Sequence, residues 1–192
     1  TMGKVMENLG DRRAHLTDMQ KENDLNKLIY TIPIRGLLGF RAEFMTLTRG
    51  MGTISSIFLK YDTHVGELKN RENGVLINME KGTTSSYSLF KIKNRGVFFL
   101  GAGEEVYGGQ IIGIHNRSND LIVNPCKGKH LTNMRTSSAD EALVLERPRA
   151  MSLENCLAFI GPDELVEITP KAIRLRKKLL NAIERKRSIP KK

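Results

Sequence analysis

Side chains that can bind phosphate are concentrated in two stretches of the sequence. The first stretch, residues 124–138, has little core-forming content, and no acid occurs in it or after it before Asp140. Long segments without secondary structure of their own are uncommon in compact domains and are usually functional or disordered. We therefore predict an RNA-binding loop here, with a surface loop that has no ligand as the alternative. The predicted donors to phosphate and sugar oxygens are Lys127, Lys129, His130, Asn133 and Arg135.

The second stretch is the basic tail, residues 171–192. It holds ten lysines and arginines and one acid, Glu184, so it carries +9 of the net charge of +10. A cationic terminus on a nearly neutral domain suits a polyanion, and nucleic acid is the commonest polyanion in a cell. A solvated tail that only aids solubility is the alternative. The tail residues predicted to neutralise phosphates are Arg174, Arg176, Lys177, Lys178, Arg185, Lys186 and Arg187.

Catalytic chemistry has little support in this sequence. There is no G-x-x-x-x-G-K-[ST] motif, which argues against a nucleotide site of that type. The short run from Gly101 to Gly103 lacks the third glycine of a dinucleotide-binding motif and is typical of a turn. The four histidines are scattered, and nothing nominates an orienting base for a serine or cysteine nucleophile. We predict that this chain is not an enzyme and holds no cofactor or metal.

Composition places the chain among ordinary globular proteins. With 192 residues, 40% hydrophobic and 27% charged, it is long enough for one large domain or two small ones. No apolar run approaches the roughly 18 residues of a membrane span, and no secretory signal opens the sequence. Cys126 and Cys156 have no partners at metal-ligand spacing, so we expect reduced thiols, a cytoplasmic location and no membrane.

The elements that would position these residues fall into two domains, together an α+β fold. In residues 1–66, apolar residues at helical spacing predict two helices, and strand-like runs predict three strands. The order is α-β-β-α-β, which lacks only the first strand of a ferredoxin-like β-α-β-β-α-β unit. We therefore expect an incomplete ferredoxin-like α/β sandwich, or another α+β sandwich of the same order. The predicted helices are 2–9 and 37–47, and the predicted strands are 15–20, 27–32 and 53–61.

Residues 67–192 form the second predicted domain, after a boundary segment at 62–74 that is rich in glycine, asparagine and charge. Short apolar runs between glycine-containing turns predict a β-rich, barrel-like or sandwich domain with short helices. Ser152 is a predicted helix N-cap. A hairpin is predicted around Thr169, although Thr169 followed by proline could instead begin a helix. The predicted strands are 74–79, 85–92, 97–100, 110–115, 142–145, 165–169 and 173–177, and a short final helix follows Lys178.

Four long segments carry a specific resemblance. They are similar to the TypA/BipA family of translational GTPases, and the resemblance extends over almost the whole chain. Motifs of this length are far more specific than any short signature. The segments are 30–50, 105–121, 127–135 and 164–177, which begin YTIPIRGLLGF, EVYGGQIIGIH, KGKHLTNMR and ELVEITPKAI.

The resemblance implies a role on the ribosome. Residues 1–66 would be most of a module similar to domain V of elongation factor G, and residues 67–192 would be the family's C-terminal domain. GTP and Mg²⁺ would belong to a GTPase domain that this sequence does not include. Members of the family assist assembly of the large ribosomal subunit, notably under cold or other stress. Their C-terminal loop, which corresponds to residues 126–141, reaches toward the peptidyl-transferase region and the acceptor end of A-site transfer RNA.

Residues and resemblance together define one hypothesis and one competitor. We expect a monomeric, RNA-binding end of a translational GTPase that contacts the large ribosomal subunit, its ribosomal RNA and, as a further candidate, transfer RNA. The alternative is a protein-interaction module, in which the barrel face and the final helix bind an acidic protein and the tail steers association. Steep salt sensitivity and competition by bulk RNA would distinguish the first from the second.

Overall fold

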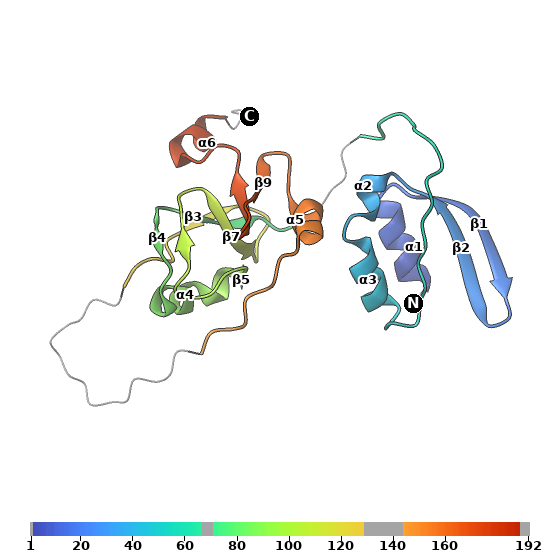
Figure 1. The fold of residues 1–192 in the computed structure, drawn as a ribbon, viewed down its shortest axis with the longest axis horizontal. Helices are drawn as coiled ribbons and strands as arrows, with labels where there is room; N and C mark the ends of the chain where they lie inside the picture. Colours follow the sequence, from blue (N-terminus) through green and yellow to red (C-terminus); the bar gives the residue numbers. More distant parts are fainter. Residues whose placement is uncertain (1, 67–70, 129–143, 189–192) are drawn as a thin grey trace. The chain divides into compact units, whose positions relative to one another are not determined.

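The computed structural model describes residues 2–66, 71–128 and 144–188 (Figure 1). The chain divides into two compact units, one built mainly from residues 1–70 and the other from 71–156 and 160–192. Helices and mixed sheets occur together, so the predicted α+β class is confirmed. The domain limits at 66 and 67 stay a prediction. None of the helices in the described ranges is long and apolar enough to cross a membrane.

The first unit packs helices against a β-hairpin (Figure 1). Val5 and Leu9 of the first helix and Phe40 of the third form its core, and Tyr30 of the hairpin packs against them. The guanidinium of Arg12 donates to the backbone oxygens of Gly36 and Leu38 at 2.8 and 2.9 Å, which ties the end of the first helix to the other two. The elements are α1 (Met2–Asp11), β1 (His15–Glu22), β2 (Leu25–Thr31), α2 (Ile34–Leu37) and α3 (Phe40–Leu47).

The predicted first helix and the two hairpin strands of this unit are confirmed. The predicted helix at 37–47 is instead divided, because Gly39 adopts a left-handed conformation between α2 and α3. The predicted strand at 53–61 is wrong. These residues form no regular element, and the side chains of Ile57, Phe58 and Tyr61 are 91%, 71% and 94% exposed. A strand requires a neighbour that accepts and donates its ladder hydrogen bonds. In the described part of the chain β1 and β2 pair only with each other, so this β-prone segment has no neighbour.

The second unit is an open, mixed sheet of six strands with short helices, and its described residues form no closed barrel. The strand order is β8-β3-β7-β10-β9, and β5 also pairs with β7. Strands β3 and β8 run parallel, and the other described pairs of this sheet are antiparallel. A separate pair joins β4 and β6. The elements from residue 75 onward are β3 (Val75–Asn78), β4 (Gly82–Thr83), α4 (Ser86–Ile92), the 3₁₀ helix η1 (Lys93–Arg95), β5 (Gly96–Phe98), β6 (Glu105–Val106), β7 (Gln110–His115), β8 (Leu121–Val123), α5 (Leu153–Phe159), β9 (Glu164–Ile168), β10 (Ile173–Lys177) and α6 (Ala182–Ser188). The last three residues of α5 are grouped with the first unit.

The core of this unit lies between the sheet and α4. Leu76 of β3 and Ile112 of β7 are fully buried, and Leu89 of α4 packs against them with 1% exposure. Both strands are buried almost throughout, which explains why they are continuous apolar runs and not alternating ones. The packing of α4 on the sheet fixes the position of the chain segments at its two ends.

The predicted strand at 85–92 is wrong, because this segment is α4. The Ser85 hydroxyl accepts a hydrogen bond from the backbone N–H of Ser88 at 3.2 Å, which caps a helix. Leu89 and Ile92 then lie three residues apart on the side that meets the core. Apolar residues in a run this short fit either element, so the cap and the packing of Leu89 on the core together decided the outcome.

The hairpin prediction and the Ser152 cap are confirmed. The Ser152 hydroxyl accepts from the backbone N–H of Asn155 at 3.2 Å and begins α5. The Thr169 hydroxyl both accepts from the backbone N–H of Ala172 and donates to its carbonyl, at 3.0 and 2.9 Å. These bonds close the turn between β9 and β10 and exclude the helical alternative. Of the predicted strand 142–145, the first half lies outside the described residues, and Val144 and Leu145 are not in a strand.

Candidate nucleic-acid interface

The predicted RNA-binding loop is described only at its start. Lys127 is exposed, so its ammonium is available to a ligand. The other four predicted loop residues, Lys129, His130, Asn133 and Arg135, lie outside the described residues.

The start of this loop is anchored to the cap of α4. The Ser85 backbone N–H donates to the Pro125 carbonyl at 2.9 Å, and the Ser85 hydroxyl donates to the Lys127 carbonyl at 2.6 Å. Pro125 is fully buried, and the Asn124 side chain accepts from the backbone N–H of Cys126 at 2.9 Å. The point at which the chain leaves the core, directly before Lys127, is therefore fixed by a buried proline and a helix cap.

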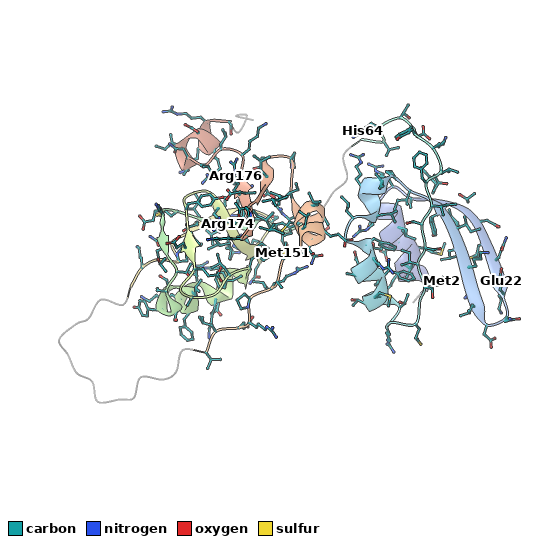
Figure 2. All side chains as sticks on the ribbon, in the orientation of Figure 1. Met2, Glu22, His64, Met151, Arg174 and Arg176 are labelled. Atoms are coloured by element: carbon teal, nitrogen blue, oxygen red, sulfur yellow. The ribbon has the colours of Figure 1, made fainter. Side chains whose placement is uncertain are left out.

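Two of the predicted tail arginines share a carboxylate. Arg174 and Arg176 lie two residues apart on β10, so they point to the same face of the sheet (Figure 2). Glu167 on β9 lies 3.4 Å from the Arg174 guanidinium and 4.0 Å from that of Arg176. The Tyr107 hydroxyl donates to the same carboxylate at 2.7 Å. All these side chains are partly exposed, and two positive charges face one negative charge, so the group keeps a net positive charge.

Tyr107 stays a hydrogen-bond donor in this arrangement. Its partial burial and its hydrogen bond to the Glu167 carboxylate both raise the pKa of Tyr107 far above its ordinary value. The phenol is therefore protonated at any physiological pH and holds the Glu167 carboxylate between the two guanidinium groups. We infer that Tyr107 is a positioning residue for the arginines of the hairpin.

Lys177 does not belong to an exposed basic surface. The structure buries this side chain to 2% exposure and places its ammonium 2.7 Å from Asp120, 2.8 Å from Asp163 and 2.9 Å from Glu164. We therefore leave Lys177 out of the proposed RNA interface, because three carboxylates already compensate its charge. The burial of Lys177 could have been predicted from strand periodicity, because Lys177 and Leu175 are two residues apart and point to the same, inward face.

Glu164 is the centre of this buried ionic cluster. Its carboxylate is 0% exposed and is bound by two nitrogens of the Arg71 guanidinium and by the backbone N–H of Gly161, the last at 2.9 Å. Burial by itself would raise the pKa of Glu164, but the donors from Arg71, Gly161 and Lys177 outweigh it and lower the pKa. Burial would likewise lower the pKa of Lys177, but its three carboxylate partners raise it. Both groups are therefore charged, and the cluster ties β10 to distant parts of the chain.

The remaining tail residues divide into exposed and anchored side chains. Lys178, Lys186 and Arg187 are exposed, the first directly after β10 and the others on α6. Arg185 is partly buried and donates to the carbonyls of Leu179 and Leu180 at 2.8 and 2.6 Å, so it holds the segment that leads into α6. Its partial burial lowers the pKa of Arg185, opposed by the negative charges of the ionic cluster.

Several of the predicted cations lie together on the second unit. Exposed cations come from the loop start, the residue after β10 and the last helix, and partly exposed arginines lie on the hairpin, so three predicted groups belong to one unit. Within the described ranges no group of histidine, cysteine and acidic side chains could hold a metal ion. Two features of the structure were not predicted from the sequence. One is the hydrogen bond between Tyr107 and Glu167, and the other is a group of basic side chains on and after α4, described below. An acid-free run from Lys81 to Gly103 was the available signal for the second.

Sequence comparisons define the class of protein to which this fold and surface belong. Residues 1–72 match the profile of the elongation factor G C-terminus, and residues 73–182 match the profile of the TypA/BipA C-terminal domain. The second match covers more than half of the chain. The chain therefore joins an elongation factor G C-terminal module to a TypA/BipA C-terminal domain. The chain belongs to the TypA/BipA family.

Curated relatives agree with this assignment. The chain is 52% identical over 188 residues to the large ribosomal subunit assembly factor BipA of Salmonella typhimurium, a match that covers 97% of this chain and 31% of the relative. The proteins of the same name from Haemophilus influenzae and Synechocystis sp. are 51% and 48% identical, over 97% and 92% of this chain. The chain thus spans about a third of the length of these relatives.

Proposed function

We propose that this chain is the ribosome-docking, RNA-binding part of a translational GTPase that acts in assembly of the large ribosomal subunit. One observation carries the proposal: this member of the family presents exposed cations at the loop start, directly after the hairpin and on the last helix, with two partly exposed arginines on the hairpin itself. Lys127, Lys178, Lys186 and Arg187 are exposed, and Arg174 and Arg176 outnumber the single carboxylate that they share. Such cations bind the phosphate backbone of RNA and release its counterions.

The whole protein would supply the chemistry that this chain does not. We propose that the parent hydrolyses GTP with Mg²⁺ in a separate domain, works in the cytoplasm, and serves ribosome assembly under cold or other stress. In this scheme the present chain is a monomeric docking part without a cofactor of its own. The loop 126–141 would extend the docking surface toward ribosomal RNA and A-site transfer RNA.

Co-sedimentation with purified large ribosomal subunits across a salt series tests the proposal. Three forms of the chain are compared: the wild type, a variant that lacks residues 127–138, and the double variant Arg174→Gln, Arg176→Gln. Glu7→Lys on α1 supplies a control that alters charge on the other unit. If the hairpin arginines meet two phosphates, their loss lowers the log–log salt slope by about 1.4 to 1.8.

The outcomes separate the possible contacts. Salt-sensitive binding that weakens in both variants supports docking through the loop and the hairpin. Binding that the deletion leaves unchanged assigns the contact to the tail alone. No binding by the wild type at low salt would contradict docking by this chain on its own.

A protein partner is the second candidate, favoured by apolar side chains beside the basic helix. Leu179, Leu180 and Ile183 are 37%, 44% and 59% exposed, although they are large and apolar. Exposed apolar groups rimmed by charge are typical of protein-binding surfaces. Capture of an acidic protein that survives nuclease treatment and is lost on Ile183→Ser would favour this function over RNA binding.

A further inference from the structure

A second basic surface lies on α4, η1 and the turn after β7, outside all the residues predicted above to bind RNA. It consists of two aromatic rings and the cations beside them, and we call it the basic–aromatic face. The Lys91 ammonium lies 4.4 Å from the centre of the Tyr87 ring, and the Lys93 ammonium lies 4.0 Å from that of Phe90. The members of the face are Tyr87, Phe90, Lys91, Lys93, Arg95 and Arg117.

The helix presents this face away from the core. Positions 87, 90 and 91 are neighbours on one side of a helix because they are three or four residues apart. The other side carries Leu89, which is 1% exposed, and Ile92, which packs against the core. Lys91 is exposed, while Tyr87 is partly buried. The rings therefore form a fixed base from which the two ammonium groups reach solvent.

Two arginines extend the face beyond the helix. Asn116 donates through its backbone N–H to the Arg95 carbonyl at 2.9 Å and through its side chain to the Asn94 carbonyl at 3.1 Å. These bonds hold the turn after β7, which carries Arg117, against the end of η1. Arg95 and Arg117 are both exposed. Four exposed cations thus lie on chain segments that adjoin one another.

The charge of this face is not compensated. The sequence has no acid between Lys81 and Glu104. Among the ion pairs of the described residues, none involves Lys91, Lys93, Arg95 or Arg117. This distinguishes the face from the hairpin, where Glu167 lies between the arginines. Uncompensated cations on a rigid element provide strong complementarity to a polyanion.

The face is also continuous with the predicted RNA-binding loop. Ser85, the N-cap of α4, is the residue that binds the carbonyls of Pro125 and Lys127 at the loop start. One short helix therefore adjoins the loop at its first turn and carries the basic–aromatic face along its length. Figure 1 shows α4 beside the point where the described chain ends at residue 128.

We propose that the basic–aromatic face binds the phosphate backbone of RNA and continues the contact that begins at the loop. This inference rests on the proposed function and adds a contact site to it. The lysines and arginines pair with phosphates, and the rings of Tyr87 and Phe90 hold the lysine ammonium groups in place through cation–π contacts. Lysine loses much rotamer freedom when it binds, and ammonium groups already held on rings lose less.

Equilibrium binding of the full chain to a short fluorescently labelled oligouridine tests the inference, with purified large ribosomal subunits as a second probe. The test variant is Lys91→Gln, Lys93→Gln. The matched control is Lys4→Gln, Lys21→Gln, which removes the same charge from exposed positions of the other unit. A second test variant, Arg95→Gln, Arg117→Gln, addresses the far end of the face. Thermal melting checks that every variant is folded.

The expected result is a weaker complex for both test variants, with a log–log salt slope shallower by about 1.4 for each pair of lost contacts to single-stranded RNA. The control should keep the wild-type slope. If the wild type binds RNA and the test and control variants show equal log–log salt slopes, this inference is overturned and the proposed function stands. A wild type that binds neither probe would overturn both. Displacement of the RNA by polyglutamate as readily as by unlabelled RNA would overturn the assignment to RNA.

Discussion

Glu164 accepts a hydrogen bond from the Lys177 ammonium at 2.9 Å, and neither side chain is more than 2% exposed. Asp120 and Asp163 lie on the same ammonium, and Arg71 binds the same carboxylate. Burying charges is costly unless each is paired and hydrogen-bonded, and here each is. The cluster therefore fixes the end of β10, the strand whose opposite face carries the arginines of the proposed interface.

Replacement of Lys177 by methionine should destabilise the fold. Methionine keeps the apolar stem but leaves the buried Glu164 carboxylate with one cation fewer, which costs about 3 kcal/mol by analogy with other broken buried pairs. Urea unfolding measures the change. The neighbouring Lys178→Met is the control, since Lys178 is exposed and its loss should stay within about 0.5 kcal/mol. Equal unfolding midpoints for the two variants would contradict the stabilising role of the cluster.

Acid should weaken the fold through Glu164. Its pKa in the folded chain lies below the ordinary value of 4.5, so its contribution to stability is complete above that value and is lost as the pH falls through the folded pKa. The free energy of unfolding, followed by denaturation at a series of acidic pH values, should therefore decline over this range. Glu164→Gln should be less stable at neutral pH and show a flatter decline. An unaltered acid slope in that variant would assign the effect to other carboxylates.

Loss of the Ser85 hydroxyl should affect both the helix and the loop start. Ser85→Ala removes the cap of α4 and the hydrogen bond to the Lys127 carbonyl, and a lost cap typically costs about 1 kcal/mol. The control is Ser86→Ala, one residue further on and exposed, which removes a hydroxyl without removing the cap. Chemical denaturation compares the two variants. A cost that is no larger for Ser85→Ala than for its neighbour would refute the anchoring role.

Removal of the charge on Glu167 should strengthen RNA binding. Glu167→Gln frees Arg174 and Arg176 from their shared carboxylate, so that more of their charge is available to phosphate. We expect a lower dissociation constant for large ribosomal subunits and a steeper salt slope, the latter by up to about 0.9. Glu7→Gln, an exposed position on α1, changes the net charge equally and serves as the control. The hairpin would be excluded from the interface if both variants bound alike.

Elements defined by local signals were predictable from the sequence. The helix at α1, the hairpin of β1 and β2, and the Ser152-capped α5 each follow from periodicity or a cap within a few residues. The β9–β10 hairpin was predicted as well, but the choice against a helix depended on the bonds between Thr169 and Ala172. For α4 the local pattern fitted both elements, and the Ser85 cap together with the burial of Leu89 against β3 and β7 made the helix the outcome.

By itself, the sequence determined the α+β class, the family resemblance and the amount and place of the positive charge, because composition and short-range spacing are properties of the chain alone. The tertiary structure decided which cations reach solvent. Lys177 is buried because carboxylates at 120 and 163–164 converge on it, and residues 53–61 remain outside any sheet because they pair with no described strand. Both outcomes depend on contacts between residues far apart in sequence, and no local pattern contains those contacts.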